Sequence, residues 1–467
     1  MNCNLHKLCA NAIKNNGIIK KMASLELIDE ITDEICKVRG IDLPRVCIKI
    51  IVLSYIMYCM NTYDVKYQNE MGQLIRLNGG CLILCQKGSG KSRTLKFLKQ
   101  IFSCINDERQ RRYKMFENTR IGLLLRKSLP LTKEEIAERE DFYHKFGRQA
   151  VNDFDDPITQ KALCEVYGMM KEYSVNNILF TIDEVGDRMI KEYCGKNPSL
   201  SAKDFMQSLN QLFDGYCAMG QSSTSRKEEI TSQYGIGANF IFVSTAEFLK
   251  DFNVQQRYKE VLEAGLGRRL LYINCPPIDQ VNVNRKRVPT DFNRFVMPIT
   301  NMFDANSKWY RGRGIPASEE LWQNALEKNG AGADLTMGEE FLLLLFSTVL
   351  AAWTLEEQIK LYHWQYMVDV YKEMKALAID VVQKDTTSYD KICTFIREHL
   401  AQRSNRKKVP IALIKDYCAR THLCYDNQFK KWFNGLLADF ANTNLSKYII
   451  ERNQTHAWLS ENYAYEG

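Results

Sequence analysis

Residues 79–92 read Gly-Gly-Cys-Leu-Ile-Leu-Cys-Gln-Lys-Gly-Ser-Gly-Lys-Ser, and this stretch decides the fold. Residues 82–84 form a short apolar run that is typical of a buried strand. Apolar residues then recur at helical spacing between positions 95 and 102. The pattern predicts a buried strand that passes through a glycine-bearing loop directly into a helix.

The chemistry of this loop points to phosphate. Successive backbone N–H groups can turn around phosphate oxygens only at unusual dihedral angles, and glycine reaches these most easily. The positive end of the following helix would face the phosphates, with Lys91 neutralising the β and γ groups and the Ser92 hydroxyl offered to Mg²⁺. We therefore predict that ATP and Mg²⁺ are bound by Gln86, Lys87, Gly88, Ser89, Gly90, Lys91, Ser92 and Arg93.

One position departs from the eight-residue phosphate-loop motif, because Cys85 stands where the leading glycine is expected. The alternative interpretation is an ordinary Gly-Ser turn before a helix. Since Lys91 and Ser92 are retained, we interpret Cys85 as a tolerated substitution at the loop entrance.

A second apolar run, residues 178–182, ends in Asp183 and Glu184. A buried strand that ends in an acidic pair suits a site opposite a phosphate loop. Asp183 would bind Mg²⁺ together with Ser92, and Glu184 would orient or deprotonate the attacking water. The alternative is that the acidic pair only forms a turn or caps a helix.

A third buried strand is predicted at residues 239–243, followed by Ser244 and Thr245. Ligands of parallel α/β sheets bind at the carboxyl ends of the strands, so these hydroxyls lie where a group that senses the γ-phosphate is needed. The alternative is a hydroxyl that merely caps the end of the strand.

Arg268 and Arg269 come just before a fourth strand-like run. An arginine delivered to a neighbouring subunit's nucleotide accelerates phosphoryl transfer strongly. The alternative is a pair of surface arginines in salt bridges.

Composition describes an ordinary soluble protein. The 467 residues are 45% hydrophobic and 25% charged, with a net charge of +7. The 15 cysteines form no CxxC pair, so we expect reduced, mostly buried thiols and neither a zinc site nor a disulfide framework. The N-terminus has no signal-peptide pattern. Residues 46–60 are apolar but interrupted by Lys49 and too short for a bilayer, which predicts a buried helix and a cytoplasmic protein without a membrane partner.

The order of these motifs resembles the ATPase of superfamily-three replicative helicases, within the AAA+ class. It resembles more closely the helicase-like P-loop ATPase domain of phage, plasmid and integrated-element replication proteins, which is often fused to a primase. The resemblance covers roughly residues 43–382 and depends on these segments: 88–92, 182–184, 212–215, 244–245 and 267–269.

The resemblance implies an α/β P-loop NTPase core in a homo-oligomer that encircles DNA, with a hexamer as one candidate assembly. A β-hairpin is expected between residues 213 and 235, and in the family's reading it tracks single-stranded DNA through Arg226 and Lys227. A long helical region, residues 339–382, would form a lid beside the nucleotide.

Four regions are expected: an α-helical prefix at 1–64, the ATPase core at 65–280 with a helical insertion at about 107–172, a basic linker and helical lid at 281–384, and a C-terminal domain at 385–467.

The basic linker carries the aromatic residues Phe292, Phe295, Trp309 and Tyr310, which would suit stacking of single-stranded bases, although an ordinary linker explains them equally.

Three helices and a hairpin make the C-terminal domain winged-helix-like. It would bind DNA or a protein partner. Its basic residues are Arg403, Arg406, Lys407, Lys408, Lys430 and Lys431.

The leading functional hypothesis is an ATP-hydrolysing motor of a mobile genetic element, a ring-forming DNA helicase or translocase that acts in replication. The alternative is an ATP-switched scaffold, such as a helicase loader, transposition regulator or defence ATPase, that binds DNA or protein partners without unwinding.

Overall fold

The computed structural model describes most of the chain, and the fold below refers to that part. The described residues are 24–127, 130–146, 159–172, 175, 177–194, 198–217, 232–250, 252–262, 266–275, 291–326, 335–378, 386–401, 408–421, 423–424, 428–440 and 448–461. They form two compact units, divided between Ile379 and Asp380.

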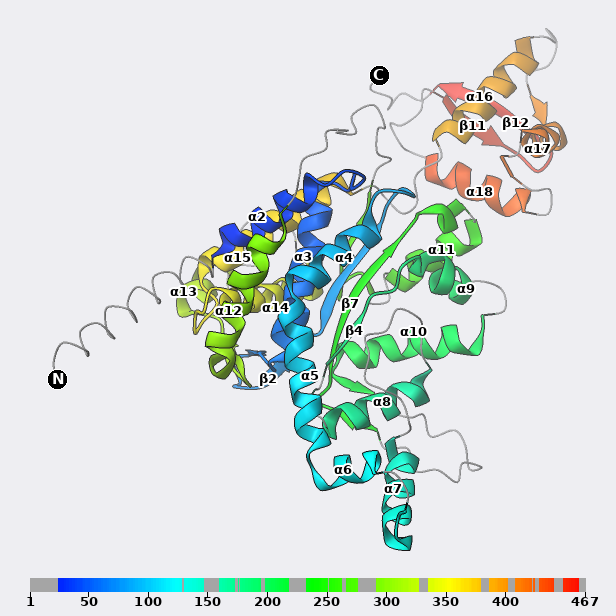
Figure 1. Ribbon diagram of the computed structural model, residues 1–467. Coiled ribbons are helices and arrows are strands. Elements are labelled where there is room, and N and C mark those ends of the chain that lie inside the picture. Colours follow the sequence, from blue (N-terminus) through cyan, green and yellow to red (C-terminus); the bar gives the residue numbers. More distant parts are fainter. Residues whose placement is uncertain are drawn as a thin grey trace, which may run out of the picture. The chain divides into compact units, whose positions relative to one another are not determined.

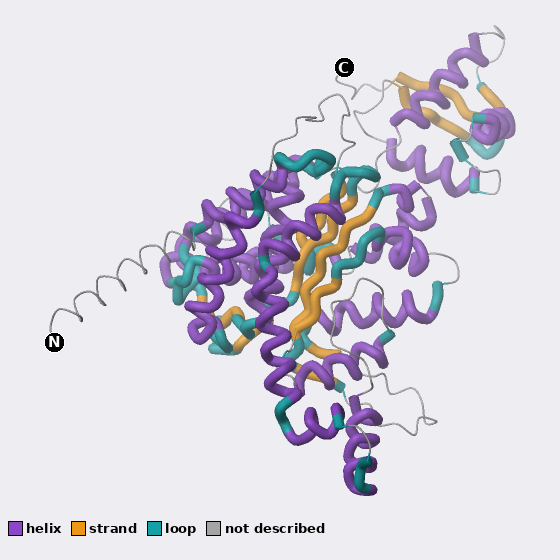
Figure 2. The backbone as a smooth tube through the Cα atoms, in the orientation of Figure 1, coloured by secondary structure: helices purple, strands orange, loops and turns teal. Residues whose placement is uncertain are grey.

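A four-stranded, all-parallel sheet lies at the centre of the first unit (Figures 1 and 2). Its order is β4 (Asn177–Phe180), β7 (Gly237–Ser244), β3 (Gly79–Leu84) and β8 (Leu271–Asn274). Every residue of β3, β4 and β7 is buried, as expected for a sheet with helices on both faces. The prediction of an α/β fold is therefore confirmed, with helix as the predominant structure.

The helix α3 (Arg45–Thr62) covers one face of this sheet, against β3 and β7. All of its residues after Arg45 are buried, which explains its apolar run. Among the described residues, α3 is the helix long and apolar enough to cross a membrane, but 94% of that segment is buried within the structure. Lys49 is accommodated in the apolar run because its ammonium pairs with Asp29 at 2.6 Å.

The first unit has one hydrophobic core on this face, shared by segments that are far apart in the sequence. Around α3 pack the helices α2 (Leu25–Cys36), α14 (Met337–Trp353) and α15 (Leu361–Leu377). The helix α14 is buried throughout residues 342–353. The helices of the predicted prefix, residues 25–62, and those of the predicted lid, residues 337–377, therefore pack together in one layer on the sheet.

The aromatic residues predicted as a stacking platform belong mostly to this core. They lie at and within α12 (Asn293–Tyr310), where Phe292, Phe295 and Tyr310 are buried. Trp309 is partly buried and is covered by the Arg313 guanidinium, 4.5 Å from the ring centroid. Stacking of single-stranded bases on Phe292, Phe295 and Tyr310 is contradicted by their burial, whereas stacking on Trp309 stays a prediction.

The other face of the sheet is covered by α8 (Gln160–Glu172), α9 (Lys191–Cys194), α10 (Leu200–Phe213) and α11 (Phe252–Val261) (Figure 1). Two short strands follow α10 and pair antiparallel: β5 (Tyr216–Cys217) and β6 (Gln233–Tyr234). They form the base of the predicted hairpin, but Arg226 and Lys227 lie outside the described residues.

The remaining elements of the first unit lie toward its periphery or mediate local packing. The glycine loop leads into α4 (Lys91–Ile101). The predicted insertion contains α5 (Ser103–Glu117), α6 (Arg120–Arg126) and α7 (Lys133–Phe146). A small sheet joins β2 (Leu74–Arg76), β1 (Lys66–Gln68) and β9 (Gly314–Pro316), and α13 (Glu319–Leu321) follows it.

The second unit has three helices and an antiparallel sheet of order β10-β12-β11. Its helices are α16 (Thr386–Ala401), α17 (Ile411–Arg420) and α18 (Phe429–Phe440), which are the three helices that the sequence predicts for this region. Its strands are β10 (Val409–Pro410), β11 (Tyr448–Arg452) and β12 (His456–Glu461). The strand β10 was not anticipated, and the predicted basic residues Arg403, Arg406 and Lys407 lie outside the described residues.

Candidate functional site: the glycine loop and the strand ends around it

The glycine loop adopts the backbone that its sequence predicts. Gly88 and Gly90 have φ of +80° and +89°, in the left-handed region that side chains disfavour. The helix α4 starts at Lys91, directly after Gly90, so its free N–H groups open toward the loop. The loop and the helix N-terminus together form the kind of concave arrangement of N–H groups that holds phosphate.

A second segment, residues 39–42, supports the loop from outside. The Asp42 N–H donates to the Ser89 carbonyl at 2.9 Å, and the Arg93 guanidinium donates to the Arg39 carbonyl at 2.5 Å. A Cβ on Gly90 would lie 2.5 Å from the Gly40 oxygen, so only glycine permits this approach. Sequence reasoning missed this support, because nothing in a turn between two helices indicates what it packs against.

Cys85 is the buried residue at the start of the glycine loop. Its N–H donates to the Ser244 carbonyl at 3.0 Å, and its thiol lies 3.2 Å from the Ser89 hydroxyl. Burial raises the pKa of this thiol to about 11, against the smaller lowering effects of Lys91 and Ser89. The group is therefore a neutral thiol that fills space under the loop, and it is not a nucleophile.

The structure brings the two predicted Mg²⁺ ligands together. Asp183 follows β4 and forms a bridge with Val243 of β7. Its carboxylate accepts a hydrogen bond from the Ser92 hydroxyl at the start of α4, and its other oxygen accepts from the Glu184 N–H at 3.0 Å. A carboxylate and a hydroxyl in contact fit Mg²⁺, which usually takes few protein ligands and completes its shell with water and phosphate.

Glu184 is held in a strained backbone conformation. Its φ is +57°, which is uncommon for a residue with a side chain. Its carboxylate accepts from the Thr245 N–H at 3.3 Å and lies 3.5 Å from the hydroxyls of Ser244 and Thr245. The Ser244 hydroxyl also accepts from the Gly186 N–H at 2.9 Å. Strain of this kind tends to occur at functional sites.

Lys91 lies beside these groups and is buried. Its ammonium donates to the Gln86 carbonyl at 3.3 Å, across the loop. Among the described residues, this carbonyl is the one hydrogen-bond partner of the Lys91 ammonium. Because the bond is long, the ammonium can replace the Gln86 carbonyl with a phosphate oxygen when nucleotide binds. The strand order explains the convergence, because β7 separates β3 from β4 and ends between the loop and the acidic pair.

The structure does not bring the two predicted arginines to this site. Arg268 and Arg269 come just before β8, and the Arg269 carbonyl lies against Gly79 at the start of β3. The strands β3 and β8 are parallel, so the arginines lie at the amino edge of the sheet and the glycine loop at its carboxyl edge. Neither arginine can therefore contact a nucleotide in the loop of its own chain.

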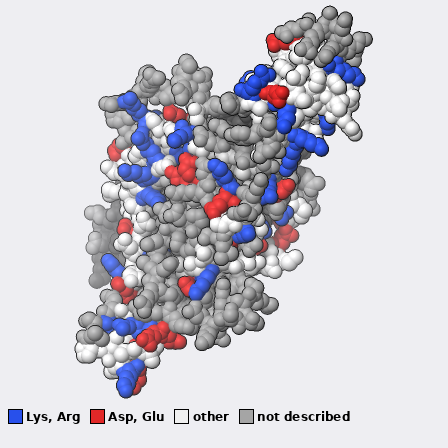
Figure 3. All heavy atoms as spheres, turned by 90° about the vertical axis from the view of Figure 1, so that its right-hand side faces the viewer, with Lys and Arg blue, Asp and Glu red and all other residues white. Residues whose placement is uncertain are grey.

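Charges on the described surface are mixed. On the face drawn in Figure 3, basic and acidic side chains are interspersed, and no continuous basic stripe is formed by the described residues of that face. The acidic residue Glu108 gathers three arginines, Arg111, Arg112 and Arg311, at 2.5 to 3.3 Å. Burial alone would raise the pKa of Glu108, but hydrogen bonds from Arg111 and Arg112 outweigh it and lower that pKa. These arginines are thus engaged with a carboxylate of their own chain.

No group of three or more His, Cys, Asp or Glu side chains suited to a metal occurs among the described residues. No protein-family model matches this chain, and no curated protein matches it either. Function is therefore inferred from the geometry of the glycine loop and its neighbours.

Proposed function

We propose that this chain is a Mg²⁺-dependent ATPase with a P-loop NTPase core of the AAA+ type. The observation that carries the proposal is the convergence of Lys91, Ser92, Asp183 and Glu184 beside a left-handed glycine loop at the carboxyl edge of a parallel sheet. They come from two segments that lie far apart in the sequence, residues 91–92 and residues 183–184. Each is of the residue type that phosphoryl transfer to water requires.

The roles follow from the contacts. The loop N–H groups and the Lys91 ammonium would bind the phosphates, while Ser92 and Asp183 would hold Mg²⁺, which supplies charge neutralisation on the phosphate oxygens. Glu184 would orient the attacking water and accept its proton. Ser244 and Thr245 hold the Glu184 carboxylate, so we assign them to its placement as well as to sensing the γ-phosphate.

The opposite locations of the loop and the arginines support an oligomer. A contact between the amino edge of one chain and the carboxyl edge of another joins different surfaces, so the assembly is heterologous and closes into a ring if the rotation permits. In such a ring an arginine before β8 would reach the neighbour's nucleotide, the role predicted for Arg268 or Arg269.

DNA is the proposed partner of this ring, with the whole acting as a cytoplasmic helicase or translocase of a mobile element. In the second unit, three helices and the β11–β12 hairpin support a winged-helix arrangement, in which α18 with Lys430 and Lys431 would face DNA. Lys408 lies 4.1 Å from the Trp458 ring centroid on the hairpin and adds a cation beside it.

The decisive experiment measures ATP hydrolysis, with and without single-stranded DNA, for Lys91→Ala and for the control Lys96→Ala. Lys96 is an exposed lysine of the same helix. We expect the first variant to lose at least 100-fold in kcat and the control to match the wild type. Equal rates for Lys91→Ala and wild type would refute the nucleotide site.

A scaffold protein would have the same nucleotide site but would not use hydrolysis to move along DNA. Strand displacement separates the two, because a scaffold would hydrolyse slowly and unwind nothing. Light scattering with a non-hydrolysable ATP analogue tests the ring: a protein that stays monomeric and ignores single-stranded DNA would refute the helicase and leave the ATPase.

A further inference from the structure

The two consecutive arginines at the amino edge of the sheet have different surroundings. The Arg269 guanidinium donates to the Asn210 side-chain oxygen at 2.5 Å and to the Asp214 carboxylate at 3.2 Å. It also lies 5.8 Å from the Phe213 ring centroid. All three partners belong to the last turn of α10 and the residue after it. Arg269 is thus fully engaged within its own chain.

Arg268 has the opposite character. Its side chain is exposed, and its guanidinium has no polar partner among the described residues. Its aliphatic stem crosses Gly338 in the first turn of α14, where a Cβ would lie 2.8 Å from the Arg268 Cβ and 2.9 Å from its Cδ. The stem is therefore seated on a glycine while the charged head is directed to solvent.

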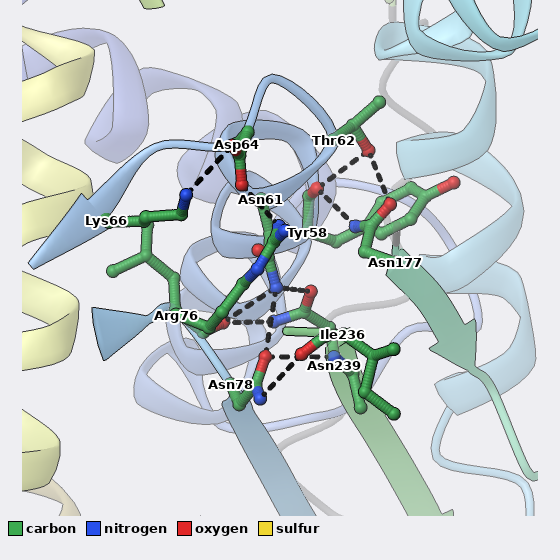
Figure 4. Close-up of polar contacts among 12 residues, drawn as sticks. Tyr58, Asn61, Thr62, Asp64, Lys66, Arg76, Asn78, Asn177, Ile236 and Asn239 are labelled. Atoms are coloured by element: carbon green, nitrogen blue, oxygen red, sulfur yellow. Dashed lines mark hydrogen bonds and ion pairs between the residues drawn. The ribbon is translucent and has the colours of Figure 1, made fainter. Parts of the chain in front are cut away.

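The turn of α10 that receives Arg269 is itself fixed to the sheet through Asn78. The Asn78 amide donates to the carbonyls of Leu212 at 2.8 Å and Ile236 at 3.3 Å, and its oxygen accepts from the Ala238 N–H at 2.9 Å. Figure 4 shows Asn61 between Asn78 and Asn239, and its amide donates to the side-chain oxygens of both, at 3.3 and 3.0 Å. Arg269 is consequently tied to a rigid point of the fold.

We propose that Arg269 is a positioning residue that holds the segment before β8 against α10. Arg268 alone then projects toward the phosphates of the nucleotide bound by a second copy of this chain. The proposal rests on the proposed function. The physical reason is that Arg269 would have to break its hydrogen bonds to Asp214 and Asn210 before it could bind a phosphate. Arg268 has no such hydrogen bonds to break within the described residues. The brace also restrains the segment next to it, because Arg269 N–H donates to Leu266 O at 3.2 Å.

The test compares the neighbouring arginines as matched variants, with kcat and KM for ATP measured at protein concentrations where the oligomer forms. Arg268→Gln should lose at least 100-fold in kcat, with KM unchanged, since the nucleotide loop of the same chain is intact. Arg269→Gln should lose about tenfold in kcat. Arg269→Lys should recover most of that loss, because lysine can still pair with Asp214.

Asp214→Asn separates the two possible roles by the sign of its effect. If Arg269 is a brace, loss of its carboxylate partner lowers kcat as Arg269→Gln does, and the double variant is no worse. If Arg269 itself acts on the neighbour, Asp214→Asn frees it and the rate stays or rises. That outcome, together with equal losses for Arg268→Gln and both Arg269 variants, would overturn the proposal.

Gly338→Ala provides a variant that alters neither arginine. Alanine favours the helix, but its Cβ would overlap the Cβ and Cδ of Arg268, so the Arg268 stem must shift. We expect a kcat loss of at least tenfold in a variant whose circular dichroism spectrum shows that it still folds, and an unchanged kcat would overturn the assigned seat. A mixture of the Lys91→Ala and Arg268→Gln variants should recover activity. In mixed oligomers, the Lys91→Ala chain supplies Arg268 to the intact nucleotide site of the Arg268→Gln chain. If the wild type does not hydrolyse ATP at all, the proposed function itself fails. This result differs from every outcome of the Arg269 variants, which are measured relative to an active wild type.

Discussion

Replacing the two loop glycines one at a time tests whether the segment at residues 39–42 sets the geometry of the nucleotide loop. Both glycines have left-handed backbones, so an alanine at either is strained. Their surroundings differ. A Cβ on Gly88 would have no atom within 4 Å, whereas on Gly90 it would lie 2.5 Å from the Gly40 oxygen and 2.6 Å from the Ile41 Cα.

The two substitutions therefore differ in cost. Gly88→Ala incurs only the left-handed penalty of about 1–2 kcal/mol. Gly90→Ala incurs the same penalty and adds an overlap with the backbone of Gly40 and Ile41, which cannot be relieved by a rotamer change. Overpacking of this kind adds about 1–3 kcal/mol, so the free energy of unfolding should fall by about 2–5 kcal/mol in total for Gly90→Ala.

The measurements are urea unfolding and titration with a fluorescent ATP analogue. Gly88→Ala should lower the free energy of unfolding by the left-handed penalty alone and bind the analogue with a modest loss. Gly90→Ala should unfold earlier and bind more weakly, by about 30-fold if some 2 kcal/mol of the overlap is relieved by displacing the loop. Equal midpoints and equal affinities for the two variants would show that residues 39–42 do not constrain the loop.

Three further predictions concern the frame around the site. Burial, with a smaller effect of Lys360, lowers the pKa of His363 to about 3, so folding keeps this imidazole neutral and stability is lost as pH falls below its ordinary value of about 6.5. Urea unfolding should show a loss of about 2 kcal/mol between pH 7 and pH 5 that is absent in His363→Gln but present in a His456→Gln control. Asn78→Ala removes the hydrogen bonds of this amide to the Leu212 and Ile236 carbonyls and from the Ala238 N–H, and should cost about 2–4 kcal/mol. Asn78→Asp should retain only the bonds that the side-chain oxygen accepts from Ala238 and Asn61, and an unchanged urea midpoint would refute the role of this amide. Gly80→Ala places a Cβ 1.8 Å from the Phe240 oxygen and should separate β3 from β7, so soluble expression at the wild-type level would contradict the register.

Local pattern predicted most of the elements. The strand β7 lies within two residues of the strand expected at residues 239–243, because a run of apolar residues indicates a strand that is buried on both faces. The meeting of Ser92 with Asp183 was also predictable, since parallel strands bring their carboxyl ends to one edge. The identities of the site residues followed from their places after strands.

Long-range packing was not predictable in the same way. The residues of α12 were interpreted as a basic linker because Arg285, Lys286, Arg287 and Arg294 dominate the local composition. Yet Phe295, Ile299 and Phe303 recur at helical spacing and lie on one buried face of α12. This spacing would have predicted the helix, but the basic composition of the region was given more weight. The support of Ser89 by Asp42 could not be found from sequence, because a backbone hydrogen bond has no residue preference to detect.

One strand links the two functional edges of the first unit. Asn78, immediately before β3, holds the turn of α10 that receives Arg269, while Cys85, immediately after β3, begins the glycine loop. The strand between them is six residues long, wholly buried and paired on both sides. A strand so enclosed moves as a rigid body with its sheet. Displacement of the arginine edge by a neighbouring chain must therefore move the nucleotide loop with it, or break the contacts of Asn78.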